Sequence, residues 1–241
     1  MLRIIDARTG EPVEAAPVRR GLTRVEAHAG GPGLTALRVL LVADLLVRAL
    51  ELGGTPVWAV LAGAPREAEL RAAAAALGVR PFEDGRDMGA GLGEAQVIHV
   101  GVREEGRVAD GGVLVEVAPV LAASEPDPDP AVLRLALLTR PRGTEMELDT
   151  AARTEAHERL TRWRRAVAGW ARSPSRPIPA EVRQRLREAW EDDLDLPGVL
   201  RVLRQVEEAG QDLPDGARFE TYAYADRLLG LDLTHDLGAP R

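Results

Sequence analysis

The chain passes from a strand into a helix through the stretch Ala29-Gly30-Gly31-Pro32-Gly33-Leu34-Thr35-Ala36-Leu37-Arg38. An apolar run over 22–29 precedes this glycine turn, and a strongly apolar helix is expected over 35–50, with a second apolar run over 55–62. Strand, turn, helix and strand in this order predict a βαβ unit, whose crossover is almost always right-handed. Because a helix N-terminus presents unpaired backbone N–H groups and a partial positive charge, the turn is a candidate anion site.

Composition bounds the class of protein. The 241 residues are 45% hydrophobic and 29% charged, as in a soluble globular protein of one large or two modest domains. The net charge of −7 gives no reason to expect broad nucleic-acid binding. The sequence contains neither lysine nor cysteine, which excludes lysine-dependent chemistry, thiolate nucleophiles and cysteine-ligated zinc. The sequence has no signal-like segment and no long apolar span, so we expect a cytoplasmic protein without a membrane partner.

The order of the predicted elements divides the chain into two domains. Strands are expected over 2–6, 22–29, 55–62, 96–102 and 113–117, and helices over 35–50 and 67–77. Alternating strands and helices predict an α/β domain over 1–123 with an open, mostly parallel sheet. The alternating prolines of 124–130 mark a boundary, because proline fits neither a helix interior nor a central strand.

Beyond this boundary every element is expected to be helical, which predicts an all-α bundle over 131–241. The helices are expected over 131–139, 149–172, 180–192, 197–208 and 219–229, and Asp149 is the expected N-cap of the second. Trp163 and Trp170 fall on the apolar stripe of that helix and are expected in the core.

Two stretches of the C-terminal half resemble motifs of cysteinyl-tRNA synthetases and of the related mycothiol cysteine ligase. Glu191-Asp192-Asp193-Leu194-Asp195-Leu196-Pro197-Gly198 is similar to their D-D-L-(N/D)-x-P stretch. Asp129-Pro130-Ala131-Val132-Leu133-Arg134-Leu135-Ala136-Leu137-Leu138 resembles their D-P-x-x-(L/I)-R-x-x-L-L helix. The run over 149–170, rich in Glu and Arg with an R-W pair, is similar to their next helix.

The N-terminal half adds weaker similarities in the same order. Residues 2–10 resemble the opening strand and T-G-x turn of the family, 38–44 the helix after its nucleotide motif, and 77–81 its A-L-x-(V/I)-x-P segment. The resemblance implies a parallel-sheet, Rossmann-like domain of the class I synthetase type, followed by a helical bundle. It also implies ATP as cofactor and an amino-acid-activating ligase as ancestral activity.

The departures from the family concern its chemistry. The two-histidine H-I-G-H motif is replaced by Gly33-Leu34-Thr35-Ala36, and the lysine-bearing K-M-S-K-S loop by a stretch over 106–112 that has no lysine. The N-x-T-D-x-D-D strand end appears as 61–65 without those side chains, and the insertion between the two halves of the sheet is almost absent. The family's zinc needs cysteine ligands, which this sequence lacks, and the first of them falls near His28. His28 could be a leftover metal ligand, but a lone histidine beside a glycine turn is more often structural, so zinc is not expected and no metal ligand is assigned.

The candidate site residues are those of the glycine turn and the first helix turn. Gly30, Gly31, Gly33 and Thr35 could bind a phosphate or nucleotide through the backbone, and Arg38 could assist the anion. Arg38 could instead form an ion pair or cap the sheet edge. Asp44, Arg48 and Glu51 form a polar stripe that we expect to be a solvated face. No catalytic residue is assigned, and His99, His157 and His235 show no zinc-type spacing.

Two functions from different classes follow. The leading hypothesis is a catalytically degenerate relative that serves as a binding or accessory protein, with an unknown protein partner or a small anionic ligand. The alternative is a ligase of the class I aminoacyl-tRNA synthetase type that uses ATP without zinc or the usual signature residues. Binding of tRNA by the Arg-rich helix over 149–172 is a further, less favoured expectation, because acidic residues lie nearby in the sequence.

Overall fold

A computed structural model describes residues 1–18, 21–30, 33–63, 67–84, 94–102, 111–122 and 129–238. Gly31, Pro32 and most of 106–112 therefore lie outside the described residues, as does most of the proline-rich boundary. None of the helices in these ranges is long and apolar enough to cross a membrane.

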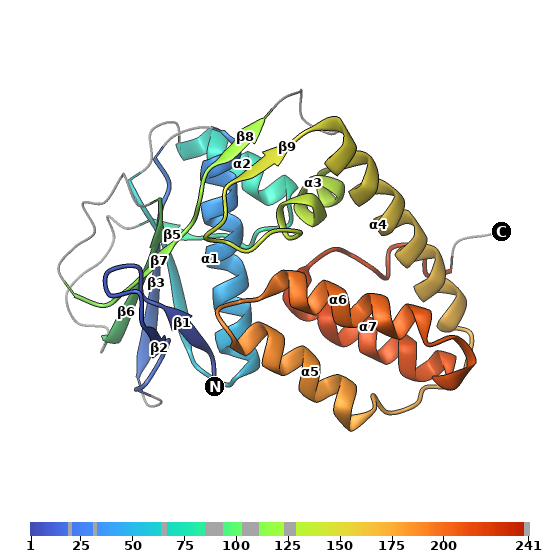
Figure 1. Cartoon of the computed structure of the whole chain (residues 1–241). Coiled ribbons are helices and arrows are strands. Elements are labelled where there is room, and N and C mark those ends of the chain that lie inside the picture. The colour runs from blue at the N-terminus through green and yellow to red at the C-terminus, as the bar shows by residue number, and fades with distance from the viewer. Residues whose placement is uncertain are drawn as a thin grey trace.

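The N-terminal half is built on a parallel sheet, as predicted (Figure 1). Four of its five strands were expected; the fifth, β5, was not, and the expected strand over 2–6 lies outside this sheet. Its strand order is β5-β4-β3-β6-β7, and every neighbouring pair is parallel. The strands are β3 (Leu22–His28), β4 (Val57–Ala62), β5 (Glu83–Asp84), β6 (Glu94–Gly101) and β7 (Val113–Glu116). This is a Rossmann-like α/β arrangement, in which β3 lies at the centre.

One helix, α1 (Leu34–Leu52), separates the sheet from the C-terminal helices (Figure 1). Val25 and Ala27 of β3 are completely buried in the core on one face of the sheet, while the alternating residues Arg24, Glu26 and His28 are half-buried. Because α1 is covered by the sheet on one side and by β8 and α7 on the other, it is apolar nearly all round. The second crossover helix, α2 (Glu67–Ala76), packs beside α1.

The C-terminal half is dominated by helices whose positions agree with the sequence prediction. They are α3 (Pro130–Leu137), α4 (Thr150–Trp170), α5 (Ala180–Glu191), α6 (Leu196–Glu208) and α7 (Asp215–Leu229), with a short 3₁₀ turn, η3 (Gly210–Asp212). Asp149 caps α4 by accepting a hydrogen bond from the amide of Ala152. Trp163 and Trp170 are buried and pack edge-on against Tyr222, which confirms their place in the core.

The expectation that only helices follow the proline boundary was wrong. The short strand β9 (Met146–Leu148) pairs in parallel with β8 (Val120–Ala122). A hairpin of β1 (Arg3–Ile5) and β2 (Pro12–Glu14) was only half expected. Strands of three residues are too short to give a periodic signal, so their pairing partners rather than their own residues decide their conformation.

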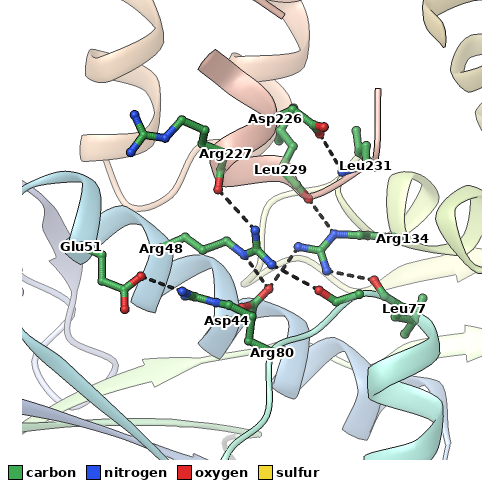
Figure 2. A network of polar contacts seen from close by, with 11 residues as sticks. Asp44, Arg48, Glu51, Leu77, Arg80, Arg134, Asp226, Arg227, Leu229 and Leu231 are labelled. Atoms are coloured by element: carbon green, nitrogen blue, oxygen red, sulfur yellow. Dashed lines mark hydrogen bonds and ion pairs between the residues drawn. The ribbon is translucent and has the colours of Figure 1, made fainter. Parts of the chain in front are cut away.

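The polar stripe on α1 is not a solvated face, contrary to the sequence expectation. Asp44 is buried, and its carboxylate accepts hydrogen bonds from Arg48 Nε at 2.8 Å, Arg80 Nε at 2.9 Å and Arg134 Nη2 at 3.2 Å (Figure 2). Arg80 also binds Glu51. Three helices and the segment after α2 meet here, because Arg48 and Arg134 also donate to backbone carbonyls of α7. Sequence spacing within α1 gives no information on such distant partners.

Candidate functional site

The order in which strands are added to the sheet changes sides at β3. From β3 the chain proceeds outward to β4 and β5, whereas β6 and β7 lie on the other side of β3. In open α/β sheets, ligands bind outside the carboxyl ends of the strands at such a switch point. The two strands that meet there end at His28 and Gly101, which are paired in register.

The N-terminus of α1 lies directly after β3. Gly33 occupies the N-cap position with φ 132°, a conformation that favours glycine, and no side chain caps the helix. Thr35 uses its hydroxyl oxygen to accept a hydrogen bond from the amide of Val120 at 3.0 Å. The anion site at Gly30, Gly33 and Thr35 therefore stays a prediction that depends on backbone N–H groups, and Gly31 lies outside the described residues.

Arg38 is completely buried and bonded to the chain itself. Its guanidinium donates to the carbonyls of Ala118 and Thr144, both at 2.9 Å, and of Pro141 at 2.8 Å. Burial lowers the pKa of Arg38 to about 10, so the group stays charged at neutral pH. These bonds join α1 to the segments on either side of α3. These contacts favour a structural role for Arg38, the alternative that the sequence left open, over a role in ligand binding.

A cluster that the sequence did not predict lies at the switch point. Glu26 and His28 of β3 and His99 of β6 place one carboxylate oxygen and two ring nitrogens within 4.8 Å of one another. His28 Nε2 and His99 Nδ1 are 3.0 Å apart, and the nearest Glu26 oxygens lie 4.0 Å and 3.8 Å from these two atoms. Glu26 and His99 are direct partners in the parallel register, so their side chains leave the sheet on the same face.

The electrostatics of the cluster keep both imidazoles neutral. Burial lowers the pKa of His99 to about 4, and the nearby His28, Arg8 and Arg24 add to this effect. Burial also lowers the pKa of His28, against an opposing effect from Glu26. A neutral imidazole has a free lone pair on one nitrogen, which is the form that binds metals.

Two further features are typical of a built site. His99 is 1% exposed, and its Nε2 has no hydrogen-bond partner among the described residues. Gly101 approaches His28 so closely that an added Cβ would lie 3.2 Å from the His28 Cβ. Because Gly101 has no side chain, the His28 side chain has room at this position.

The arginines of α4, the region of the tRNA expectation, are largely bonded within the protein. Arg159 pairs with Glu155, Arg162 binds Glu207 at 2.9 Å, and Arg164 donates to two carbonyls after α7. A cavity of about 360 Å³ between α4 and α6 has Arg159, Arg162 and other arginines in its lining. Five arginines and two glutamates line this cavity, so its lining is predominantly basic although the acidic side chains and the ion pairs offset part of the charge.

The fold defines a Rossmann-like α/β protein with C-terminal helices. Over part of its length the chain is homologous to the mycothiol cysteine ligases, as the sequence motifs predicted. It is 42% identical over 113 residues to the L-cysteine:1D-myo-inositol 2-amino-2-deoxy-alpha-D-glucopyranoside ligase of Parafrankia sp., a match that covers 44% of this chain and 24% of the relative.

Two further relatives carry the same name. The protein of Streptomyces griseus is 39% identical over 44% of this chain and 25% of its own length. That of Kytococcus sedentarius is 36% identical over 56% of this chain and 33% of its own length. The match thus covers only a quarter to a third of the length of these three relatives. No protein-family model matches it.

Proposed function

We propose that the protein is a catalytically degenerate relative of the mycothiol cysteine ligases that serves as a binding or accessory protein. In this proposal the sheet and the C-terminal helices are kept as a scaffold, whereas the activation of an amino acid by ATP has been lost. The function of the chain would then be to bind a protein partner or a small anionic ligand.

The observation that carries the proposal is the chemistry at the start of α1. In the family that the chain resembles, two histidines at this position stabilise charge on the phosphates of ATP. Here the positions hold Gly33-Leu34-Thr35-Ala36. The polar groups nearby, Thr35 and Arg38, are bonded to the backbone of the segments before and after α3. Preorganised donors that stabilise developing charge are usually the largest contribution to catalysis, so their replacement removes the main source of rate.

The absence of lysine supports the same conclusion. The lysine-rich loop of the family contacts pyrophosphate, and this sequence has no lysine at any position. By contrast, the motifs that remain have structural roles. Asp129 caps α3 through the amide of Ala131, and Asp195 caps α6 through the amide of Gly198. A chain that has the helix caps of these motifs but lacks the catalytic side chains is what we expect of a scaffold.

ATP–pyrophosphate exchange tests the proposal. The purified chain is assayed with cysteine and with the other amino acids, beside the Streptomyces griseus ligase as an active control. We expect exchange at the background rate for this chain only. Exchange above background with any amino acid would instead support the alternative, a ligase that works without the usual signature residues.

The identity of the ligand is addressed by separate binding measurements. Titration with ATP and with inorganic phosphate tests the small anionic ligand proposed for Gly30 and Gly33. Co-purification from cell extract followed by mass spectrometry tests the protein partner. For tRNA, the variant Arg162→Glu with Arg165→Glu should weaken binding and flatten its salt dependence if α4 is the contact surface.

A further inference from the structure

We propose that Glu26, His28 and His99 form a binding site for one divalent transition-metal ion, with zinc as the expected occupant. The family that the chain resembles binds zinc through cysteine thiolates, which this chain lacks. The proposed site uses other ligands, two imidazoles and a carboxylate. It is independent of the proposed loss of catalysis, because a metal could be bound with or without activity.

The distances fit a tetrahedral ion with little rearrangement. Zinc–nitrogen bonds of about 2.0–2.1 Å at tetrahedral angles separate two ligand nitrogens by about 3.4 Å. His28 Nε2 and His99 Nδ1 are 3.0 Å apart, within a few tenths of this value. The Glu26 carboxylate reaches 3.8 Å from His99 Nδ1 and 4.0 Å from His28 Nε2, so a small rotation brings an oxygen into position. The three ligands converge from two adjacent strands.

The surroundings favour an ion over a plain hydrogen bond. His99 is 1% exposed, and its Nδ1, the atom that would bind the ion, lies 3.0 Å from His28 Nε2 in a place largely closed to solvent. Glu26 is half-buried and provides negative charge for a cation, of which Arg24, 3.7 Å from its carboxylate, offsets a part. Gly101 holds open the space for His28. Neutral imidazole suits zinc, copper and nickel, whereas calcium and magnesium prefer sites built of oxygen.

Three protein ligands leave one position of a tetrahedral ion open. Zinc sites of this kind hold water or a ligand there, whereas closed four-ligand sites are structural. The cluster lies at the carboxyl edge of β3 and β6, where the fold presents ligands. The ion would therefore supply a cation at the switch point, where it can bind an anionic group of a small molecule.

Direct titration tests the site. The full-length chain is freed of metal with a chelator and titrated with ZnCl₂ by calorimetry, and with CoCl₂ by visible absorption. We expect one ion per chain and a cobalt spectrum of low-coordinate type without a thiolate charge-transfer band. His28→Asn and His99→Asn should each weaken zinc binding by at least about 10-fold, and Glu26→Gln should weaken it less.

Two other histidines provide matched controls. His157→Asn and His235→Asn change exposed side chains away from the cluster, and neither should alter the affinity. Circular dichroism and the melting temperature show whether each variant is folded, and His28→Asn, on a half-buried side chain, is the milder change if His99→Asn fails to fold. Absence of stoichiometric binding, or binding that survives both cluster variants, would overturn the proposal. Neither result depends on ATP–pyrophosphate exchange.

Discussion

Asp44 of α1 and Arg134 of α3 form a buried ion pair, with Arg134 Nη2 donating to Asp44 Oδ2 at 3.2 Å (Figure 2). Each residue belongs to a stretch that resembles the ligase family, one in the N-terminal and one in the C-terminal half. The two stretches with weak sequence similarity therefore contact each other in the structure through this ion pair. It joins the parallel sheet to the helices through α1, and Arg134 continues it to the carbonyls of Leu77 and Leu229.

Loss of the shared carboxylate should strongly destabilise the fold. Asp44→Asn removes the charge that three arginines contact and leaves the buried guanidinium of Arg134 without this countercharge. We expect a loss of about 3–5 kcal/mol in the free energy of unfolding, measured by urea denaturation. Glu51→Gln is the control, because Glu51 is 44% exposed and, among the described residues, its ion pair is with the half-exposed Arg80. Its effect should stay below about 1 kcal/mol, and equal effects would contradict a special role for Asp44.

Arg38 should matter for stability rather than for ligand binding. Arg38→Met removes the donors to Ala118, Pro141 and Thr144, and we expect a loss of about 2 kcal/mol or more in the free energy of unfolding. Arg204→Met, which changes an exposed arginine of α6, should have an effect within about 0.5 kcal/mol. If Arg38→Met instead lowers phosphate or ATP affinity at unchanged stability, Arg38 binds the anion.

A methyl group at Gly101 should disturb the histidine cluster. Gly101→Ala places a Cβ 3.2 Å from the Cβ of His28 and 3.4 Å from its carbonyl oxygen. We expect a destabilisation of about 1 kcal/mol and a weaker affinity for zinc, because His28 must move. The same change at Gly63 meets no atom within 4 Å and should leave both quantities unchanged. Calorimetric titration and urea denaturation of the two variants give the comparison.

Acid should destabilise the metal-free protein through His99. The pKa of His99 is lowered from 6.5 to about 4 in the folded state, so between these values the unfolded chain binds more protons. Stability therefore rises with pH across this window and is lost as the pH falls from 6.5 to 4, by up to roughly 3 kcal/mol. The groups that face His99 are His28, Glu26, Arg8 and Arg24.

His99→Gln isolates this contribution. Urea unfolding at several pH values between 4 and 7, in the presence of chelator, should give a clearly shallower pH dependence for the variant than for the original chain. The neighbouring His28 retains its own lowered pKa, so some dependence remains in the variant. Identical pH profiles for both proteins would show that His99 is not held neutral by its surroundings.

Much of the fold could be predicted from the sequence because its long elements carry their own signals. The apolar run of α1, the glycines around it and the cap at Asp149 act within a few residues, so their effect is readable along the chain. The pairing of β8 with β9 was not predicted, because each strand is only three residues long. The burial of Asp44 depends on arginines 36 and 90 residues away.

The histidine cluster could not be found by spacing for a similar reason. His28 and His99 are 71 residues apart and become neighbours only through the register of β3 with β6. The alternation of Arg24, Glu26 and His28 with the buried residues Thr23, Val25 and Ala27 was the available signal, since it placed charged and ring side chains on one face of a central strand. If strand 96–102 had been placed beside strand 22–29 in a parallel sheet, His99 would have been recognised as a neighbour of Glu26 and His28.

The contact of β1 with the D-D-L-D stretch has a consequence for how the protein is made. The amide of Ile5 donates to the Asp193 carboxylate at 2.9 Å, and the amide of Asp193 donates to the carbonyl of Arg3 at 2.9 Å. Strand β1 can therefore form these two hydrogen bonds only after the ribosome has translated most of the chain, up to Asp193. We expect nascent chains that end before this stretch to expose their N-terminal hairpin to proteases and chaperones. The sheet domain is then completed only when the last helices pack against α1.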